Sequence, residues 1–322
     1  MRIHELGDGT PEVAVVGAIH GDEPCGARAI DRLVDAAPAV ERPVKLVVAN
    51  EEAAARGERY VDEDLNRAFP GDPNADSHER RLAHALKREL RDCTTLAFHS
   101  TQSYADPFAI IDTVDPISRS VCKRLPIEVV VETGDRTDGR LIAHARSIEV
   151  ECGLQGSAAA ARNAWDVLRH FLAATDVLWT PDDLPAAREG DFAADAAPPA
   201  DAASDGGEPV GTAAVDGNEA AGGDEAADAA DTPAAVATDR AVPADDGREV
   251  PVFRFGDPIP KPPGERYEVF VDNFTHVASG TRFATVDGEA LHAEADFYPI
   301  LLSANGYESI FGYAGEHVGT LD

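Results

Sequence analysis

The chain has 322 residues, 43% of them hydrophobic, and a formal net charge of −31 that comes from 59 acidic and 28 basic residues. Such a chain buries a sizeable core and has room for more than one domain, while its acidity argues against nucleic acid or an anionic membrane as a partner. It has no apolar run long enough to cross a bilayer, and MRIHELGDG at its N-terminus lacks the hydrophobic region of a signal peptide, so we expect a cytoplasmic protein.

Strand and helix patterns alternate through residues 1–182. Short apolar runs predict strands at 12–19, 44–50, 93–100, 107–112 and 146–153. Apolar residues at helical spacing predict helices at 23–37, 76–90 and 157–174. This alternation predicts an α/β domain with a mostly parallel or mixed sheet flanked by helices.

Residues 183–250 differ in composition, because they are rich in Ala, Asp, Gly and Pro and contain hardly any large apolar residue. Such a segment buries too little surface to offset its chain entropy, so we expect a disordered insertion or linker. An alanine-rich helix is the weaker alternative, because Gly and Pro recur throughout. Residues 191–248 hold 14 Asp plus Glu and 2 Arg, a net charge of −12, which leaves −31 + 12 = −19 elsewhere. The folded part is therefore acidic too, which suits a halophile-type cytosol.

Hydrophobic alternation returns in residues 251–322. The segments RYEVFVDNF, TRFATVD and EALHAEADFYPILLS read as short strands separated by turns. We expect a small β domain here.

The chain has four cysteines, and they form neither a CxxC pair nor a zinc-ribbon spacing: Cys25, Cys93, Cys122 and Cys152. In a reducing cytosol these are expected to be small buried thiols.

Residues of the types that bind metal ions lie at the ends of two predicted strands. His20 and Glu23 follow VAVVGAI, and His99 ends the strand TLAFH. The crevice beyond the carboxyl ends of parallel strands is where α/β sheets bind ligands. Two His and one Glu are a donor set of hydrolytic zinc enzymes. Taken singly, each residue is more simply a loop or strand-end side chain.

A polar loop lies between these ligand positions. ERYVDEDLNRAFPG contains Arg59, Asn66 and Arg67 among acidic residues. Guanidinium groups bind carboxylates through paired hydrogen bonds, so this loop is suited to a substrate carboxylate. The alternative is surface ion pairing, which is common in an acidic protein.

Four motifs, in chain order, resemble the succinylglutamate desuccinylase/aspartoacylase family of the zinc carboxypeptidase-like clan: GAIHGDEPCG, RYVDEDLNRAFPG, AFHST and IEVECGLQG. The likeness covers roughly residues 13–170 and is weaker in the C-terminal segment. The acidic insertion has no counterpart in the family pattern. It implies a zinc carboxypeptidase-like fold and one zinc ion per chain. Its implied ligands are His20, Glu23 and His99.

The resemblance also implies roles for further residues. It implies that Arg59 polarises the scissile carbonyl, and that Asn66 and Arg67 bind the substrate carboxylate. Tyr307, in SANGYESIFGY, resembles a tyrosine that closes over the site, although a packed tyrosine explains it nearly as well.

The family's general base matches Glu151 in ECGLQG. Strand periodicity alone does not select it, because Glu149 and Glu151 point to the same face of a strand. We expect Glu149 to be a solvated or ion-paired acid. A further arginine for a second substrate carboxylate is expected before Glu151; Arg140 and Arg146 both qualify, and neither has the expected spacing.

These inferences predict a zinc-dependent deacylase that cleaves the amide bond of an N-acyl amino acid, such as N-succinylglutamate or N-acetylaspartate, with a metal-activated water and a Glu general base. A peptide-cleaving zinc carboxypeptidase and a non-catalytic binding module are the alternatives. The expected partner is a small-molecule substrate, with neither nucleic acid nor membrane, and the sequence leaves a homo-oligomer open.

Overall fold

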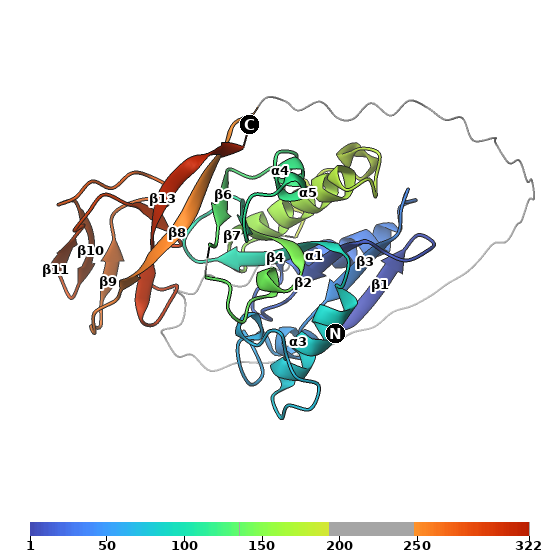
Figure 1. Ribbon diagram of the computed structural model, residues 1–322, viewed down its shortest axis with the longest axis horizontal. Coiled ribbons are helices and arrows are strands. Elements are labelled where there is room, and N and C mark those ends of the chain that lie inside the picture. The colour runs from blue at the N-terminus through green and yellow to red at the C-terminus, as the bar shows by residue number, and fades with distance from the viewer. Residues whose placement is uncertain (135, 193–247, 322) are drawn as a thin grey trace, which may run out of the picture. The chain divides into compact units, whose positions relative to one another are not determined.

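The computed structural model describes residues 1–134, 136–192 and 248–321 (Figure 1). Its larger sheet contains β1 (Arg2–Leu6), β2 (Val13–Gly17), β3 (Val44–Val48), β4 (Thr94–Thr101), β5 (Phe108–Ile111), β6 (Val129–Glu132), β7 (Arg146–Leu154), β8 (Val250–Pro260), β12 (Tyr298–Ile300) and β13 (Ile310–Leu321). A smaller sheet contains β9 (Tyr267–Val269), β10 (Arg282–Val286) and β11 (Glu289–His292). The helices are α1 (Cys25–Ala36), α2 (Glu51–Arg56), α3 (His78–Glu89), α4 (Pro116–Cys122) and α5 (Ala158–Ala174), with short 3-10 turns η1 (Leu65–Arg67), η2 (Leu141–Ala143) and η3 (Pro181–Asp183).

The ten-stranded sheet is mixed, with the order β1-β3-β2-β4-β7-β5-β6-β8-β13-β12. Strands β3, β2, β4 and β7 run parallel to one another, whereas β5 is antiparallel to β7. The predicted α/β class with a mixed sheet flanked by helices is therefore confirmed.

The C-terminal segment contributes to both sheets. β8 pairs in parallel with β6, and β13 then pairs antiparallel with β8 and β12 (Figure 1, orange to red). The small antiparallel sheet agrees with the β structure expected after residue 251, but the extension of the main sheet was not foreseen. The division into 1–182, 183–250 and 251–322 stays a prediction, and most of its middle segment lies outside the described residues.

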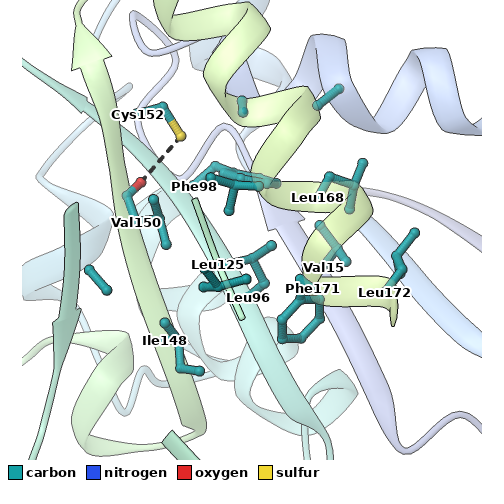
Figure 2. Packing of buried hydrophobic residues seen from close by; sticks show 14 of the residues in the cluster. Val15, Leu96, Phe98, Leu125, Ile148, Val150, Cys152, Leu168, Phe171 and Leu172 are labelled. Atoms are coloured by element: carbon teal, nitrogen blue, oxygen red, sulfur yellow. Dashed lines mark hydrogen bonds between the residues drawn. The ribbon is translucent and has the colours of Figure 1, made fainter. Parts of the chain in front are cut away.

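One face of the sheet carries a hydrophobic core beneath α1 and α5. Even-numbered residues of β4 and β7 lie in this core, and Phe98 and Val150 belong to the same buried cluster as Phe171 of α5 (Figure 2). Because side chains alternate along a strand, the odd-numbered residues face the opposite side, which is covered by a second core that includes residues of α3, η1 and η2. His99, Glu149 and Glu151 therefore share the second face.

All four cysteines are buried free thiols, as expected. Cys152 lies in the core of Figure 2, where its Sγ is 3.6 Å from the carbonyl oxygen of Val150. Among the described segments, no helix combines the length and the apolar content that a membrane span needs.

Candidate active site

The three predicted metal ligands meet in space. His20 lies in the loop after β2, Glu23 lies just before α1, and His99 lies in β4. One ligand atom from each falls within 4.8 Å of the other two, and all three residues are buried. The Nδ1 atoms of His20 and His99 lie 2.8 and 3.1 Å from the two carboxylate oxygens of Glu23. Both histidines thus turn the same ring nitrogen toward the same carboxylate.

This grouping depends on a close approach between two loops. A Cβ atom on Gly21 would lie 2.2 Å from the backbone carbon of Ala53, so only glycine fits beside α2. The N–H of Gly21 donates to the carbonyl oxygen of Arg59 at 3.1 Å. The HGDE loop is therefore fixed against the loop that carries Arg59.

Electrostatic coupling holds the cluster together. Burial opposes the charged form of each histidine, but Glu23 outweighs it and raises the pKa of His20, and raises the pKa of His99 to about 9. Burial likewise opposes the charged form of Glu23, whose pKa the two histidines hold well below its usual range. The pocket is thus built for positive charge beside Glu23.

The donor set fits zinc. Two imidazoles and one carboxylate are zinc ligand types, and zinc bonds of about 2.0–2.2 Å are compatible with the separations of 2.8 and 3.1 Å between the histidine nitrogens and the Glu23 oxygens. Three protein ligands leave a fourth position for water or substrate, which is the pattern of catalytic sites.

Arg59 and Asp64 border this cluster. Arg59 donates to Glu23 Oε1 at 3.0 Å and to Asp64 Oδ2 at 3.2 Å. Asp64 Oδ1 lies 3.1 Å from Nε2 of His20, and Arg59 Nη2 lies 3.1 Å from the same nitrogen. Asp64 was not among the residues predicted from the sequence; its only signal was its place just before the Leu-Asn-Arg run of the polar loop.

A buried carboxylate from α3 supports this polar loop. Glu79 is fully buried and accepts the backbone N–H groups of Val61, Asp62 and Glu63 at 2.7 to 3.2 Å. It also accepts a hydrogen bond from the side chain of Asn50 at 2.9 Å. Glu79 thus fixes the segment between Arg59 and Asp64.

Asn66, Arg67 and Arg140 line one side of the site. The side-chain oxygen of Asn66 accepts the N–H of Leu141 at 2.9 Å, which brings η2 against η1. Burial and the nearby charge of Arg140 lower the pKa of Arg67, so the two cations are close. Arg146 instead lines a separate groove with Lys87. Of the two arginines left open by the sequence, the structure brings Arg140 to the site.

Glu149 and Glu151 point to one face of β7, as expected. In the pairing of β4 with β7, Glu151 is opposite His99 and Glu149 is opposite Ala97. Burial raises the pKa of Glu151 to about 7, a value suited to exchanging a proton near neutral pH. The prediction of a solvated Glu149 is wrong, because this residue is only 3% exposed; the ion-paired alternative agrees with its 3.9 Å separation from His99 Nε2.

These residues line one cavity of about 430 Å³, hereafter the site cavity. All the sequence-predicted site residues line it: His20, Glu23, Arg59, Asn66, Arg67, His99, Glu151 and Tyr307. The C-terminal segment contributes one wall, including Tyr307 and Tyr313, whose rings lie 6.3 Å apart. Burial raises the pKa of the Tyr307 hydroxyl, so it stays protonated in neutral solution. Tyr313 was not predicted from the sequence, because it has no motif of its own.

Comparison with known proteins shows what the chain is similar to. Residues 9–125 match the model of the succinylglutamate desuccinylase/aspartoacylase catalytic domain. A succinylglutamate desuccinylase of Pseudomonas aeruginosa is 36% identical over 86 residues, which cover 22% of this chain and 26% of that relative. The chain thus matches about a quarter of the length of that curated relative.

Solved structures share the fold over nearly the whole chain. The ectoine utilization protein EutE (DoeB) of Ruegeria pomeroyi has a TM-score of 0.63 and 18% identity, with 99% of this chain and 88% of that one covered. A succinylglutamate desuccinylase from Silicibacter sp. TM1040 has a TM-score of 0.65 and 17% identity, with 98% and 88% covered. Murine aminoacylase 3 has a TM-score of 0.62 and 16% identity, with 98% of both chains covered.

The matched segment contains His20, Glu23, Arg59 and His99, which the structure gathers at one site. On these findings, residues 9–125 are similar to the catalytic domain of the succinylglutamate desuccinylase/aspartoacylase family, and the described fold is that of solved structures which include a succinylglutamate desuccinylase.

Proposed function

We propose that the protein is a zinc-dependent amidohydrolase that cleaves the amide bond of an N-acyl amino acid. The observation that carries this proposal is the convergence of His20, Glu23 and His99 with Glu151 in one buried cavity. The match of residues 9–125 to the family's catalytic domain supports it, and similar proteins bear the names succinylglutamate desuccinylase and aminoacylase 3.

His20, Glu23 and His99 would hold the zinc ion. The bound metal supplies Lewis-acid chemistry: it lowers the pKa of water and polarises a carbonyl oxygen. The chain's own residues perform the proton transfer and the binding of the substrate.

Glu151 acts as the general base. Its carboxylate, whose pKa is raised to about 7 by burial, accepts a proton from the attacking water, whose oxygen forms a bond to the carbonyl carbon. The same carboxyl group then passes this proton to the amide nitrogen as the carbon–nitrogen bond breaks. One water is consumed, and its second proton also ends on the leaving nitrogen, so the products are a carboxylate and a protonated amine.

The arginines bind negative charge. Arg59 lies beside the metal ligands, where its guanidinium stabilises the oxygen that becomes anionic as water adds. Arg67 and Arg140 line the same cavity and bind carboxylates of the substrate. Two arginines suit substrates with more than one carboxylate, such as N-succinylglutamate or N-acetylaspartate.

The wall formed by the C-terminal segment favours a small substrate over a peptide. A volume of about 430 Å³ falls in the range of small-molecule pockets, and Tyr307 and Tyr313 cover part of the site. A carboxypeptidase needs a cleft that accommodates a longer chain.

A substrate panel tests this proposal. N-acetyl and N-succinyl derivatives of aspartate, glutamate and an aliphatic amino acid are incubated with the zinc-loaded protein, and the free amino acid is measured. We expect release from one or more of the acidic substrates and much less from the aliphatic ones. Cleavage of peptides alone would support a carboxypeptidase, and zinc binding without any hydrolysis would support a binding module.

A further inference from the structure

His20 and His99 have similar carboxylate neighbours, although Arg59 also lies 3.1 Å from Nε2 of His20. Each turns Nδ1 toward Glu23, at 2.8 and 3.1 Å, and each turns Nε2 toward a second carboxylate. For His20 this carboxylate is Asp64, at 3.1 Å. For His99 it is Glu149, whose Oε2 lies 3.9 Å from Nε2.

The sheet directs Glu149 to His99. Glu149 on β7 is opposite Ala97 on β4, and His99 is the next residue of β4 on the same face. Ala97 has only a methyl group, so the longer side chain of Glu149 can extend past it toward the imidazole. Diagonal neighbours of this kind are within reach of long side chains.

Burial makes this pairing strongly favoured. Glu149 is 3% exposed and His99 is 4% exposed. Within the described part of the chain, neither His99 Nε2 nor Glu149 Oε1 has a hydrogen-bond partner. Buried polar groups in native proteins are nearly always paired, and these two side chains already form an ion pair across a short gap.

We propose that Glu149 is a positioning residue for the metal site: its carboxylate accepts the Nε2–H of His99 and thereby holds Nδ1 as the metal-binding atom. The inference rests on the zinc site of the proposed function. Metal-ligating histidines commonly donate their second N–H to a carboxylate, which fixes the tautomer and the ring orientation. Glu149 is thus assigned a role different from that of Glu151, two residues further along β7.

Zinc affinity tests this assignment directly. The dissociation constant of zinc is measured by competition with a chromophoric chelator, at one pH, for the wild type, Glu149→Gln, Glu149→Ala and Glu151→Gln. Loss of such a partner typically weakens metal binding about 10- to 100-fold. We expect a loss of this order in Glu149→Ala and a smaller one in Glu149→Gln, because the amide oxygen still accepts a hydrogen bond without the charge. Glu151→Gln is the matched control and should keep wild-type affinity.

Turnover at saturating zinc gives a second readout. A positioning defect should be largely rescued in Glu149→Gln when zinc is in excess, whereas Glu151→Gln should stay inactive. In addition, the absorption spectrum of the cobalt-substituted protein should change in the Glu149 variants and not in Glu151→Gln. Thermal unfolding without metal checks that the nearly isosteric Glu149→Gln protein is folded.

The outcomes separate the two proposals. If both Glu149 variants bind zinc with wild-type affinity, the proposed role of Glu149 is overturned and the proposed hydrolase activity is unaffected. If zinc binding depends on Glu149 but the wild-type protein hydrolyses no N-acyl amino acid, only the proposed hydrolase activity is overturned. A wild-type protein that does not bind zinc would overturn both.

Discussion

The side-chain oxygen of Asn66 accepts a hydrogen bond from the backbone N–H of Leu141 at 2.9 Å. Two residues before Leu141, the backbone of Gly139 packs closely against that of Arg67. Gly139 has φ +73°, and a Cβ atom there would lie 2.5 Å from the carbonyl oxygen of Arg67. These contacts bind the turn before β7 to the polar loop. They explain why Arg140 and Arg67 line the same cavity although they lie far apart in the sequence.

We predict that Arg140→Ala raises the KM for a substrate with two carboxylates. Hydrogen bonds to charged groups contribute about 1.5–3 kcal/mol, which corresponds to roughly 10- to 150-fold in KM. The control is Arg146→Ala, which makes the same chemical change outside the site cavity. Steady-state kinetics of the two variants should differ; equal effects would remove Arg140 from substrate binding.

Glu151→Gln should retain zinc and substrate binding but lose turnover. Glutamine has nearly the same shape as glutamate, yet it does not accept the proton of the attacking water. General-base catalysis typically contributes about 10²- to 10⁴-fold, and we expect a loss of kcat of at least that order. Substrate binding by calorimetry and zinc content by elemental analysis serve as controls. An active Glu151→Gln protein would exclude Glu151 as the general base.

His20→Ala and His99→Ala should each abolish tight zinc binding. The purified wild type should hold about one zinc ion per chain, because the cluster offers three ligands and one open position. His84→Ala is the control, since His84 lines a separate groove. Elemental analysis after dialysis measures the outcome, and full zinc occupancy in His99→Ala would show that His99 is not a ligand.

Glu79→Gln should destabilise the protein in a pH-dependent way. Burial opposes the charge of Glu79, but hydrogen bonds from Val61, Asn50, Asp62 and Glu63 outweigh it, so the pKa of Glu79 is lowered in the folded state. We expect a loss of about 1.5–3 kcal/mol in the free energy of unfolding at neutral pH.

The lowered pKa fixes the sign of the pH effect. The stabilisation is fully present above the pKa of glutamate in the unfolded chain and is lost as the pH falls through the lower pKa of the folded protein. Urea unfolding of wild type and Glu79→Gln should therefore converge in acid. Glu63→Gln, which removes an exposed ion pair with Arg80, should cost at most about 1 kcal/mol. A difference that persists unchanged in acid would contradict this account.

The sequence predicted much of the site because its signals are local. His20 and Glu23 lie three residues apart after an apolar strand, and His99 ends another strand, so an α/β sheet with parallel strands brings them together. Each predicted helix and strand of residues 1–182 agrees with an observed one to within a few residues, whereas β1, α2, α4 and β6 were not predicted.

Other missed features depend on long-range contacts. The choice between Arg140 and Arg146 required the hydrogen bond from Leu141 to Asn66. The burial of Glu149 depends on its neighbours in the sheet, since alternation along a strand defines a face but not what covers it. Likewise, the pairing of β8 with β6 joins strands that are more than a hundred residues apart, and no local pattern encodes it.

The most direct test of the proposed zinc-dependent hydrolysis is metal removal followed by reconstitution. The protein is stripped with a chelator, dialysed, and assayed for release of free amino acid from N-acetylaspartate and N-succinylglutamate as zinc is added back. We predict that the stripped protein is inactive, that activity rises in proportion to zinc and reaches a plateau near one ion per chain, and that reconstituted Glu151→Gln stays inactive. Undiminished hydrolysis by the stripped protein, or no hydrolysis of either substrate by a protein that has bound one zinc ion, would contradict the account.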